Sequence, residues 1–254
     1  MNITHYPLLV CVLSAVVLGA SAWTGMLLLG RRRALDDVVR PDFSIIVTAT
    51  LTLFGLIIGF TFSMAVSRYD QRKNFEEAEA NAIGTAYVRA DLLPPADAGS
   101  VRSLLARYLD ERIQAYRADD ESQLAAIDAR TTRLQSDLWK AVQTPATANP
   151  TPVIALAVAG MNDVLNSQGY TQAADRNRIP TAAWVLLAVI AICCNVLVGW
   201  AFHRHPGAGR LLLILPLLSA VAFMLIADID TPRHGIIRVQ PQNLITLEQS
   251  LHTR

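Results

Sequence analysis

The sequence predicts an all-α integral membrane protein, with four transmembrane helices and a helical extramembrane insert between the second and the third. Two observations support this class. Of the 254 residues, 52% are hydrophobic and only 17% are charged, which is more apolar than an ordinary soluble domain. The apolar residues also gather in four uncharged runs, and a polar segment with helical periodicity separates the second run from the third.

The four uncharged runs are long enough to cross a bilayer, for which roughly 17–25 apolar residues are needed. They contain 24, 25, 22 and 17 residues and cover Pro7–Gly30, Phe43–Ser67, Thr181–Phe202 and Leu211–Ala227. For the last and shortest run, a buried helix of a soluble core is the alternative. The first run is expected to remain as an anchored helix, because Arg31–Arg33 follow the apolar stretch, whereas a signal peptide carries its positive charge in front.

These runs divide the chain into four segments. Residues 1–67 hold the first two transmembrane helices, 68–180 the insert, 181–228 the third and fourth transmembrane helices, and 229–254 a C-terminal tail. In the insert we expect a helix capped by Ser100, because apolar residues recur after it with a helical period. A second helix is expected over 121–143, ended by the three prolines of 144–152, and a third from about Val153 to Ser167.

The second uncharged run continues without a proline into a charged segment. Small and polar residues recur along it at a mean spacing of 3.6 positions, so they share one face of a continuous helix. This face, here called the polar stripe, comprises Thr48, Thr52, Gly55, Gly59, Ser63, Ser67, Asp70, Asn74, Glu77, Asn81 and Gly84. It is about 54 Å long, against about 30 Å for the hydrocarbon layer, so the helix must project into water.

Two interpretations of the polar stripe compete. The spacing of Gly55, Gly59 and Ser63 is a small-xxx-small pattern, which lets another helix pack closely. Alternatively, a ring of such helices would enclose a polar pore lined by the stripe from Thr48 to Glu77, with Asp70 and Glu77 forming acidic rings at its mouth. The polarity continues well beyond the membrane, which packing does not require and which favours the pore. Phe54, Ile58 and Phe62, on a neighbouring face, could form a hydrophobic constriction or contact lipid.

Other polar residues near the predicted membrane edges have structural explanations first. We expect Arg68 and Arg72 to form a solvated cluster, with binding to lipid phosphates or pairing with Asp70 and Glu76 as the alternatives. Asn195 is expected to hydrogen-bond across helices. Asp228 and Asp230 beside Arg233 are expected to form an ion-paired cap, with ion binding or gating as the alternative. His203 and His205 lack a third ligand, so no metal site is predicted.

No catalytic function is predicted. The sequence has no phosphate-binding glycine loop, no zinc-protease motif and no nucleophile elbow, and it indicates no cofactor. The net charge of +1 and the lack of a basic patch argue against a nucleic-acid partner. Arginines are concentrated in the two short loops between the runs, which by the positive-inside rule places the insert and both termini outside the cytoplasm.

Two stretches, "GFTFSMAVSRYDQRKNFEEAEANAIGTAYVRADLLP" (Gly59–Pro94) and "DIDTPRHGIIRVQP" (Asp228–Pro241), resemble a bacterial membrane family of unknown function described as bestrophin-like. The resemblance extends over nearly the whole chain. It implies a multi-pass protein of the bacterial inner membrane. By analogy with true bestrophins it also implies a pentameric anion channel with four spans, a pore lined by the second span and an aromatic neck.

The chain departs from true bestrophins in two respects. It lacks their aromatic-and-proline neck sequence, and its acidic stripe argues against a path for anions. The leading hypothesis is therefore a homo-oligomeric ion channel in contact with membrane lipids, in which the stripe suggests cations and the family suggests anions. The alternative is a non-conducting scaffold or sensor, in which the stripe packs on the insert of its own chain and the insert docks other proteins.

Overall fold

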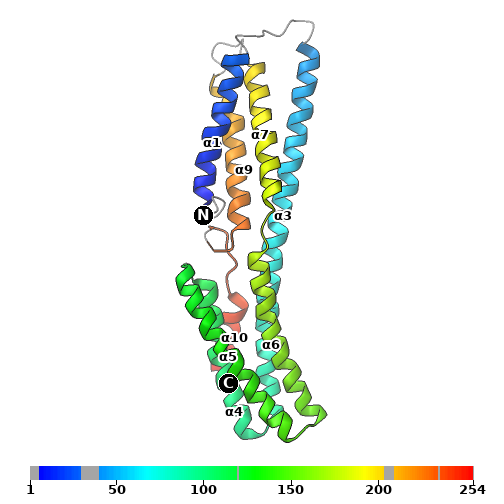
Figure 1. Ribbon diagram of the computed structural model, residues 1–254, viewed down its shortest axis with the longest axis vertical. Coiled ribbons are helices and arrows are strands. Elements are labelled where there is room, and N and C mark those ends of the chain that lie inside the picture. Colours follow the sequence, from blue (N-terminus) through cyan, green and yellow to red (C-terminus); the bar gives the residue numbers. More distant parts are fainter. Residues whose placement is uncertain (1–5, 30–39, 119, 203–208, 234, 254) are drawn as a thin grey trace. The chain divides into compact units, whose positions relative to one another are not determined.

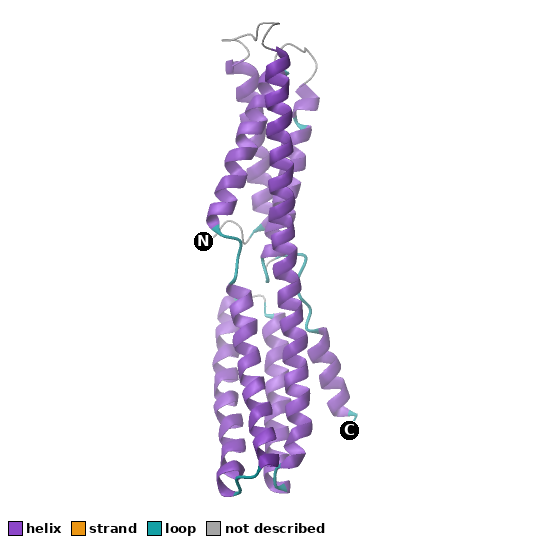
Figure 2. Ribbon diagram, turned by 90° about the vertical axis from the view of Figure 1, so that its right-hand side faces the viewer, coloured by secondary structure: helices purple, strands orange, loops and turns teal. Residues whose placement is uncertain are grey.

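The computed structural model describes residues 6–29, 40–118, 120–202, 209–233 and 235–253. Within these ranges all regular structure is helical, which confirms the all-α class (Figures 1 and 2). The helices form two compact units, one of Met1–Ser67 with Arg178–Ile237 and the other of Arg68–Asn177 with Arg238–Arg254. The C-terminal tail expected over 229–254 is therefore divided between the two units, after Ile237. Arg31–Arg33, His203 and His205 lie outside the described residues.

The first unit contains the most apolar helices. These are α1 (Pro7–Thr24), the π-helical turn η2 (Gly25–Leu29), the first part of α3 (Arg40–Arg89), α7 (Thr181–Ala201), α8 (Gly209–Leu212) and α9 (Ile214–Asp230). Helix α1 packs against both α7 and α9, and the three lie side by side in Figure 1. Aromatic pairs join α3 to this group, because the ring of Phe43 meets Trp200 at 4.9 Å and Phe54 meets Phe223 at 6.4 Å, edge to face.

Among the described residues, three helical stretches are long and apolar enough to cross a membrane. They lie within Pro7–Leu27, Asp42–Leu92 and Pro152–Ala201. Helix α9 has 17 residues and is shorter than these. The side chains of the three long apolar stretches are largely exposed in the single chain, as expected of surfaces that face acyl chains or another subunit. The chain is therefore a membrane protein.

Two glycines let α1 and α7 approach backbone to backbone. A Cβ atom on Gly199 of α7 would lie 2.0 Å from the carbonyl oxygen of Ala22, and one on Gly25 would lie 2.1 Å from that of Val196. Neither position can hold a side chain without displacing backbone. Close contact through small residues is how helices pack inside membranes, where apolar burial gives no advantage over lipid.

The second unit is a bundle of amphipathic helices. It contains the rest of α3, the 3₁₀ turn η3 (Ala90–Leu92), α4 (Pro95–Arg117), α5 (Glu121–Ala148), α6 (Pro152–Arg176) and α10 (Gln242–His252). Each helix contributes residues that are buried almost completely, including Ile83, Leu105, Leu138, Val164 and Leu244. The insert thus has a hydrophobic core of its own, and α10 from the C-terminal segment completes it.

The helix boundaries in the insert differ from those expected. Helix α4 begins at Pro95, so Ser100 lies inside the helix and does not cap it; proline suits the first turn because its missing N–H would be unpaired there anyway. Helix α5 continues past Pro145 to Ala148. Helix α6 begins at Pro152, where the Thr151 hydroxyl accepts the Ile154 N–H at 3.2 Å, and runs on to Arg176.

Candidate pore-lining face

Helix α3 is a single α-helix of 50 residues, Arg40–Arg89. The continuity expected of the junction between apolar and charged segments is therefore present. The ten stripe residues from Thr48 to Asn81 are all exposed in the single chain, and Gly84 is half-buried. The opposite face is buried by other helices of the same chain, at Phe54, Thr61, Ala65, Arg72, Glu76, Glu79 and Ile83. The polar stripe from Thr48 to Asn81 thus lies on the part of α3 that its own chain leaves uncovered, together with exposed apolar residues such as Leu56 and Phe60.

Groups on the exposed face have little packing role within the chain. A Cβ atom built on Gly55 or Gly59 would meet nothing within 4 Å. The hydroxyls of Thr48 and Thr52 donate to carbonyl oxygens one turn earlier, each at 2.9 Å, which leaves the hydroxyl oxygens available as acceptors. Such hydroxyls can face either water or a polar ligand at membrane depth.

The three bulky residues expected near a constriction do not share one environment. Phe54 is only 3% exposed and packs on Phe223, so it belongs to the helix core of its own chain. Ile58 is half-buried, whereas Phe62 is exposed and lies beside the stripe residue Ser63. The sequence could not separate them, because all three lie one helical turn apart on the same side of α3.

The partners of two carboxylates on the buried face of α3, Glu76 and Glu79, were not predicted from the sequence. Glu76, 1% exposed, accepts the backbone N–H groups of Asn243 and Leu244, each at 3.0 Å, and the Asn243 side-chain amide at 2.6 Å. It therefore binds the first turn of α10, where a negative charge is favoured by the helix dipole. A signal existed, since Glu76 keeps helical spacing with Arg72, Glu79 and Ile83.

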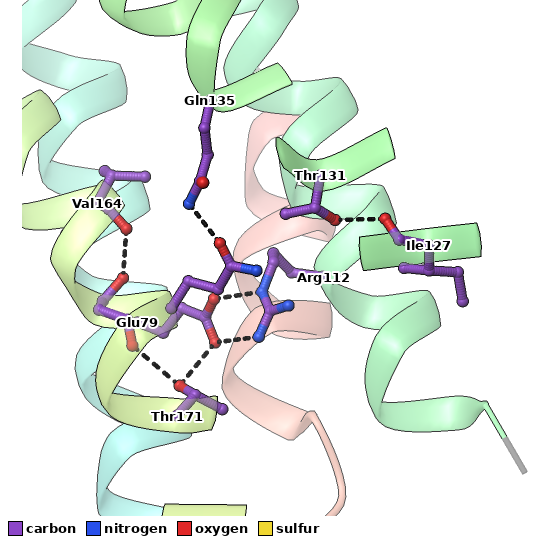
Figure 3. A network of polar contacts seen from close by, with 9 residues as sticks. Glu79, Arg112, Ile127, Thr131, Gln135, Val164 and Thr171 are labelled. Atoms are coloured by element: carbon purple, nitrogen blue, oxygen red, sulfur yellow. Dashed lines mark hydrogen bonds and ion pairs between the residues drawn. The ribbon is translucent and has the colours of Figure 1, made fainter. Parts of the chain in front are cut away.

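Glu79 anchors a buried polar network in the second unit (Figure 3). Its carboxylate accepts from Arg112 Nε at 2.5 Å and Nη2 at 3.3 Å, and from the Thr171 hydroxyl at 3.3 Å. Glu79 is fully buried and Arg112 is only 3% exposed. The network joins α3, α4 and α6, and Gln135 of α5 adds a hydrogen bond to Gln168.

Burial and charge shift the titration of groups around Glu79. Burial raises the pKa of Tyr108 and of Tyr116 well above the usual tyrosine value, and the Glu79 carboxylate raises both further. For Arg112, burial alone would lower the pKa, but the adjacent Glu79 raises it, so this guanidinium remains charged. The bundle core thus holds a charged guanidinium, bonded to Glu79, beside two neutral phenols.

Arg68, Arg72 and Asn195 lie in surroundings other than those expected. Arg72 is buried, and the Arg68 guanidinium donates to the Asn177 side chain at 2.6 Å, so the two do not form a solvated cluster. Asn195 is buried in α7 and its amide donates to Ala191 of the same helix at 2.8 Å, not across helices. These corrections concern structure and leave the stripe unaffected.

Asp228 and Asp230 bind backbone N–H groups. Asp228 accepts those of Ile236 and Ile237, and Asp230 accepts that of Ile179 at 3.2 Å. Their carboxylates therefore fix the chain at the end of α9 and the start of α7. Among the described residues, no group of three or more histidine, cysteine, aspartate or glutamate side chains could hold a metal ion.

Comparisons with known proteins agree with this architecture. The Bestrophin-like domain matches residues 10–244, while no curated protein matches the sequence. A single-substitution variant of a bacterial bestrophin homolog from Klebsiella pneumoniae superposes with a TM-score of 0.68 at 14% identity, covering 96% of both chains. The form of that homolog phased on zinc superposes with a TM-score of 0.66 at 14% identity, over 95% of this chain and 97% of the other. The chain belongs to the Bestrophin-like family.

Proposed function

We propose that the protein is a homo-oligomeric ion channel in which α3 lines the pore with Thr48, Thr52, Gly55, Gly59, Ser63, Ser67, Asp70, Asn74 and Glu77. The observation that carries this proposal is that all nine of these residues are exposed in the single chain, opposite a face of α3 that the chain itself buries. A ring of copies arranged around an axis would give this face a common, water-filled environment. Family membership and the shared fold support the same reading.

In the proposed architecture, α9 is a fourth membrane span beside α1, α3 and α7. Its 17 residues are almost entirely apolar and can span a bilayer at the short end of the required range. The protein is then a multi-pass protein of the cell inner membrane, surrounded by lipid. The helical insert forms a vestibule on the side away from the cytoplasm, and the resemblance to bestrophins favours five subunits.

The conducted ions are proposed to be inorganic cations. Asp70 and Glu77 are exposed and two helical turns apart on the stripe, so each would form a ring of carboxylates in an oligomer. Such rings raise the local concentration of cations and repel anions. Conduction would be passive, past the hydroxyls of Thr48, Thr52 and Ser63. Ile58 and Phe62 are the proposed constriction, since Phe54 is buried in the chain.

The alternative is a non-conducting scaffold or sensor, in which the stripe packs on the insert of its own chain. That arrangement requires Asp70, Asn74, Glu77 and Asn81 to be covered by the insert. All four are exposed, which favours the channel.

Ion flux from liposomes tests the proposal. Purified full-length protein is reconstituted, and the release of K⁺ and of Cl⁻ down their gradients is measured separately. We expect K⁺ release that Asp70→Asn and Glu77→Gln reduce, because each removes a ring of charge. Asp137→Asn, which neutralises an exposed carboxylate of α5 away from the stripe, is the matched control and should conduct normally. No release of either ion, or equal release from all three variants, contradicts the proposal.

A further inference from the structure

A fixed turn follows α9 in the first unit. The carboxylate of Asp228, which is 5% exposed, accepts the backbone N–H of Ile236 at 2.7 Å through Oδ1 and that of Ile237 at 2.9 Å through Oδ2. Gly235 lets the backbone after α9 come close to Asp228, because a Cβ atom at position 235 would lie 2.5 Å from the Asp228 carbonyl oxygen. Asp228 and Gly235 together hold residues 235–237 against the end of α9.

This turn presents apolar side chains outward. Ile236 is 86% exposed and Ile237 is 37% exposed. Burial of such side chains stabilises a protein, so a turn that held them exposed in water would lose that stabilisation. The exposed apolar surface continues onto Leu8 of α1 and Leu225 of α9, which are 71% and 36% exposed. The turn is thus part of the same apolar surface as the membrane-spanning helices.

A pocket of about 400 Å³ lies within this surface, lined mainly by Tyr6, Leu8, Met224, Leu225, Ile236 and Ile237. Asp228 also borders it, but both of its carboxylate oxygens already accept backbone N–H groups. A polar ligand would therefore find few groups to bind, whereas an apolar chain needs none. The volume is within the range of ligand sites in proteins.

We propose that this pocket holds an acyl chain of a bilayer phospholipid, and that the Ile236 turn dips into the adjacent leaflet. The pocket lies where α1 begins and α9 ends, next to Tyr6, an aromatic residue of the kind that sits at headgroup level. Its lining continues directly into the exposed apolar faces of both helices. An acyl chain from the surrounding bilayer can therefore enter the pocket directly from these faces. This inference does not depend on ion conduction.

Fluorescence quenching tests the contact with lipid. Ile236→Trp is reconstituted in full-length protein into phosphatidylcholine liposomes with or without brominated acyl chains. The emission added by the new tryptophan should be lost in the brominated lipid, because bromine quenches on contact. Gln143→Trp, on the exposed surface of α5, should keep its added emission. If the emission added at position 236 survives, the turn faces water or a second copy of the chain, and the proposal is overturned.

A second measurement tests occupancy of the pocket. Met224→Trp should fill the pocket, whereas Leu218→Trp places the same side chain on a 64% exposed position of α9 that does not line it. Native mass spectrometry of protein released from phospholipid nanodiscs should show a retained phospholipid per chain in the Leu218 variant and its loss in the Met224 variant. Equal phospholipid retention by the two variants overturns the pocket assignment. If Met224→Trp does not fold, the quenching result decides.

Discussion

At the scale of the residue, the buried pair of Glu79 and Arg112 is the interaction most sensitive to change. Glu79→Gln leaves the guanidinium charge in the core without a counter-charge, and we expect the free energy of unfolding to fall by about 3–5 kcal/mol. Chemical unfolding of the purified protein in detergent, followed by circular dichroism, measures this. The reason is desolvation: burial disfavours the Arg112 charge, and its hydrogen bonds to Glu79 are what mainly offset that cost.

The matched control is Glu111→Gln, which breaks the more exposed pair that Glu111 forms with Arg130. It should change stability little, because water screens that pair. Replacing both core partners by apolar residues, Glu79→Leu with Arg112→Met, should recover much of the loss. Equal losses from Glu79→Gln and Glu111→Gln would show that the buried pair has no special role.

The two buried phenols predict a dependence of stability on pH. The pKa of Tyr108 and of Tyr116 is raised in the folded protein, by burial first and then by Glu79. In the unfolded chain both phenols ionise at about pH 10. Their contribution to the free energy of unfolding is therefore complete below that pH and declines as the pH rises above it. Thermal unfolding between about pH 8 and about pH 11 measures the decline. The variant Tyr108→Phe with Tyr116→Phe should show a flatter profile, and an unchanged slope would exclude these two groups.

At the scale of the element, glycines with different surroundings should tolerate substitution differently. Gly199→Ala places a methyl group against the backbone at Ala22, and we expect a loss of about 1–3 kcal/mol from the overpacked contact of α1 with α7. Gly55→Ala meets open space in the single chain, so the fold should remain stable. Unfolding curves of the two variants in detergent make the comparison; similar losses would mean that Gly55 is also packed against the chain.

The docking of α10 depends on a single carboxylate. Glu76→Ala removes three hydrogen bonds at the first turn of α10, and we expect this helix to detach more readily while the rest of the bundle stays folded. Limited proteolysis should then cleave 242–253 faster than in the unaltered protein. Glu77→Ala, an exposed neighbour on the stripe, is the control. Equal cleavage rates for both variants would contradict the docking role of Glu76.

Helix boundaries were the least predictable elements, for reasons visible at particular prolines. Pro145 was expected to end α5, yet proline disturbs only the bond and contacts one turn before it, and the helix continues for three more residues. The end comes at Asn149, before Pro150 and Pro152. The helix expected to be capped by Ser100 begins instead at Pro95, because proline is favoured in a first helical turn. In both cases the effect of proline depends on its position within the helix, and the sequence alone does not give that position.

At the scale of the whole molecule, the sequence predicted what depends on local periodicity. The all-α class, the apolar helices and the continuity of α3 follow from spacing alone. Partners distant in the chain do not follow from it. Glu79 meets Arg112 and Thr171, 33 and 92 residues away, and Asp228 binds backbone N–H groups, which every sequence offers. The period also could not show that Phe54 is buried by α9 while Phe62 is exposed. The pore-lining role of the stripe stays a prediction.

Cross-linking tests that role in the assembled protein. Cysteines are introduced singly as Ser63→Cys, Asp70→Cys and Glu77→Cys, after replacement of the three free native cysteines, Cys11, Cys193 and Cys194. If α3 surrounds a shared axis, equivalent positions in neighbouring copies face one another, since a ring repeats the same surface around the axis. A short thiol cross-linker applied to membranes should then join pairs of neighbouring copies at all three positions.

The control for this experiment is Phe54→Cys, on the buried face of α3, which should give no product between copies. If positions 70 and 77 give no product between copies, the scaffold is favoured, because the stripe is then covered by its own insert. Joining at position 54 but not on the stripe would reverse the assignment of faces. The sharp prediction is thus a periodic one: cross-linking should follow the 3.6-residue spacing of the stripe along α3 and vanish half a turn away.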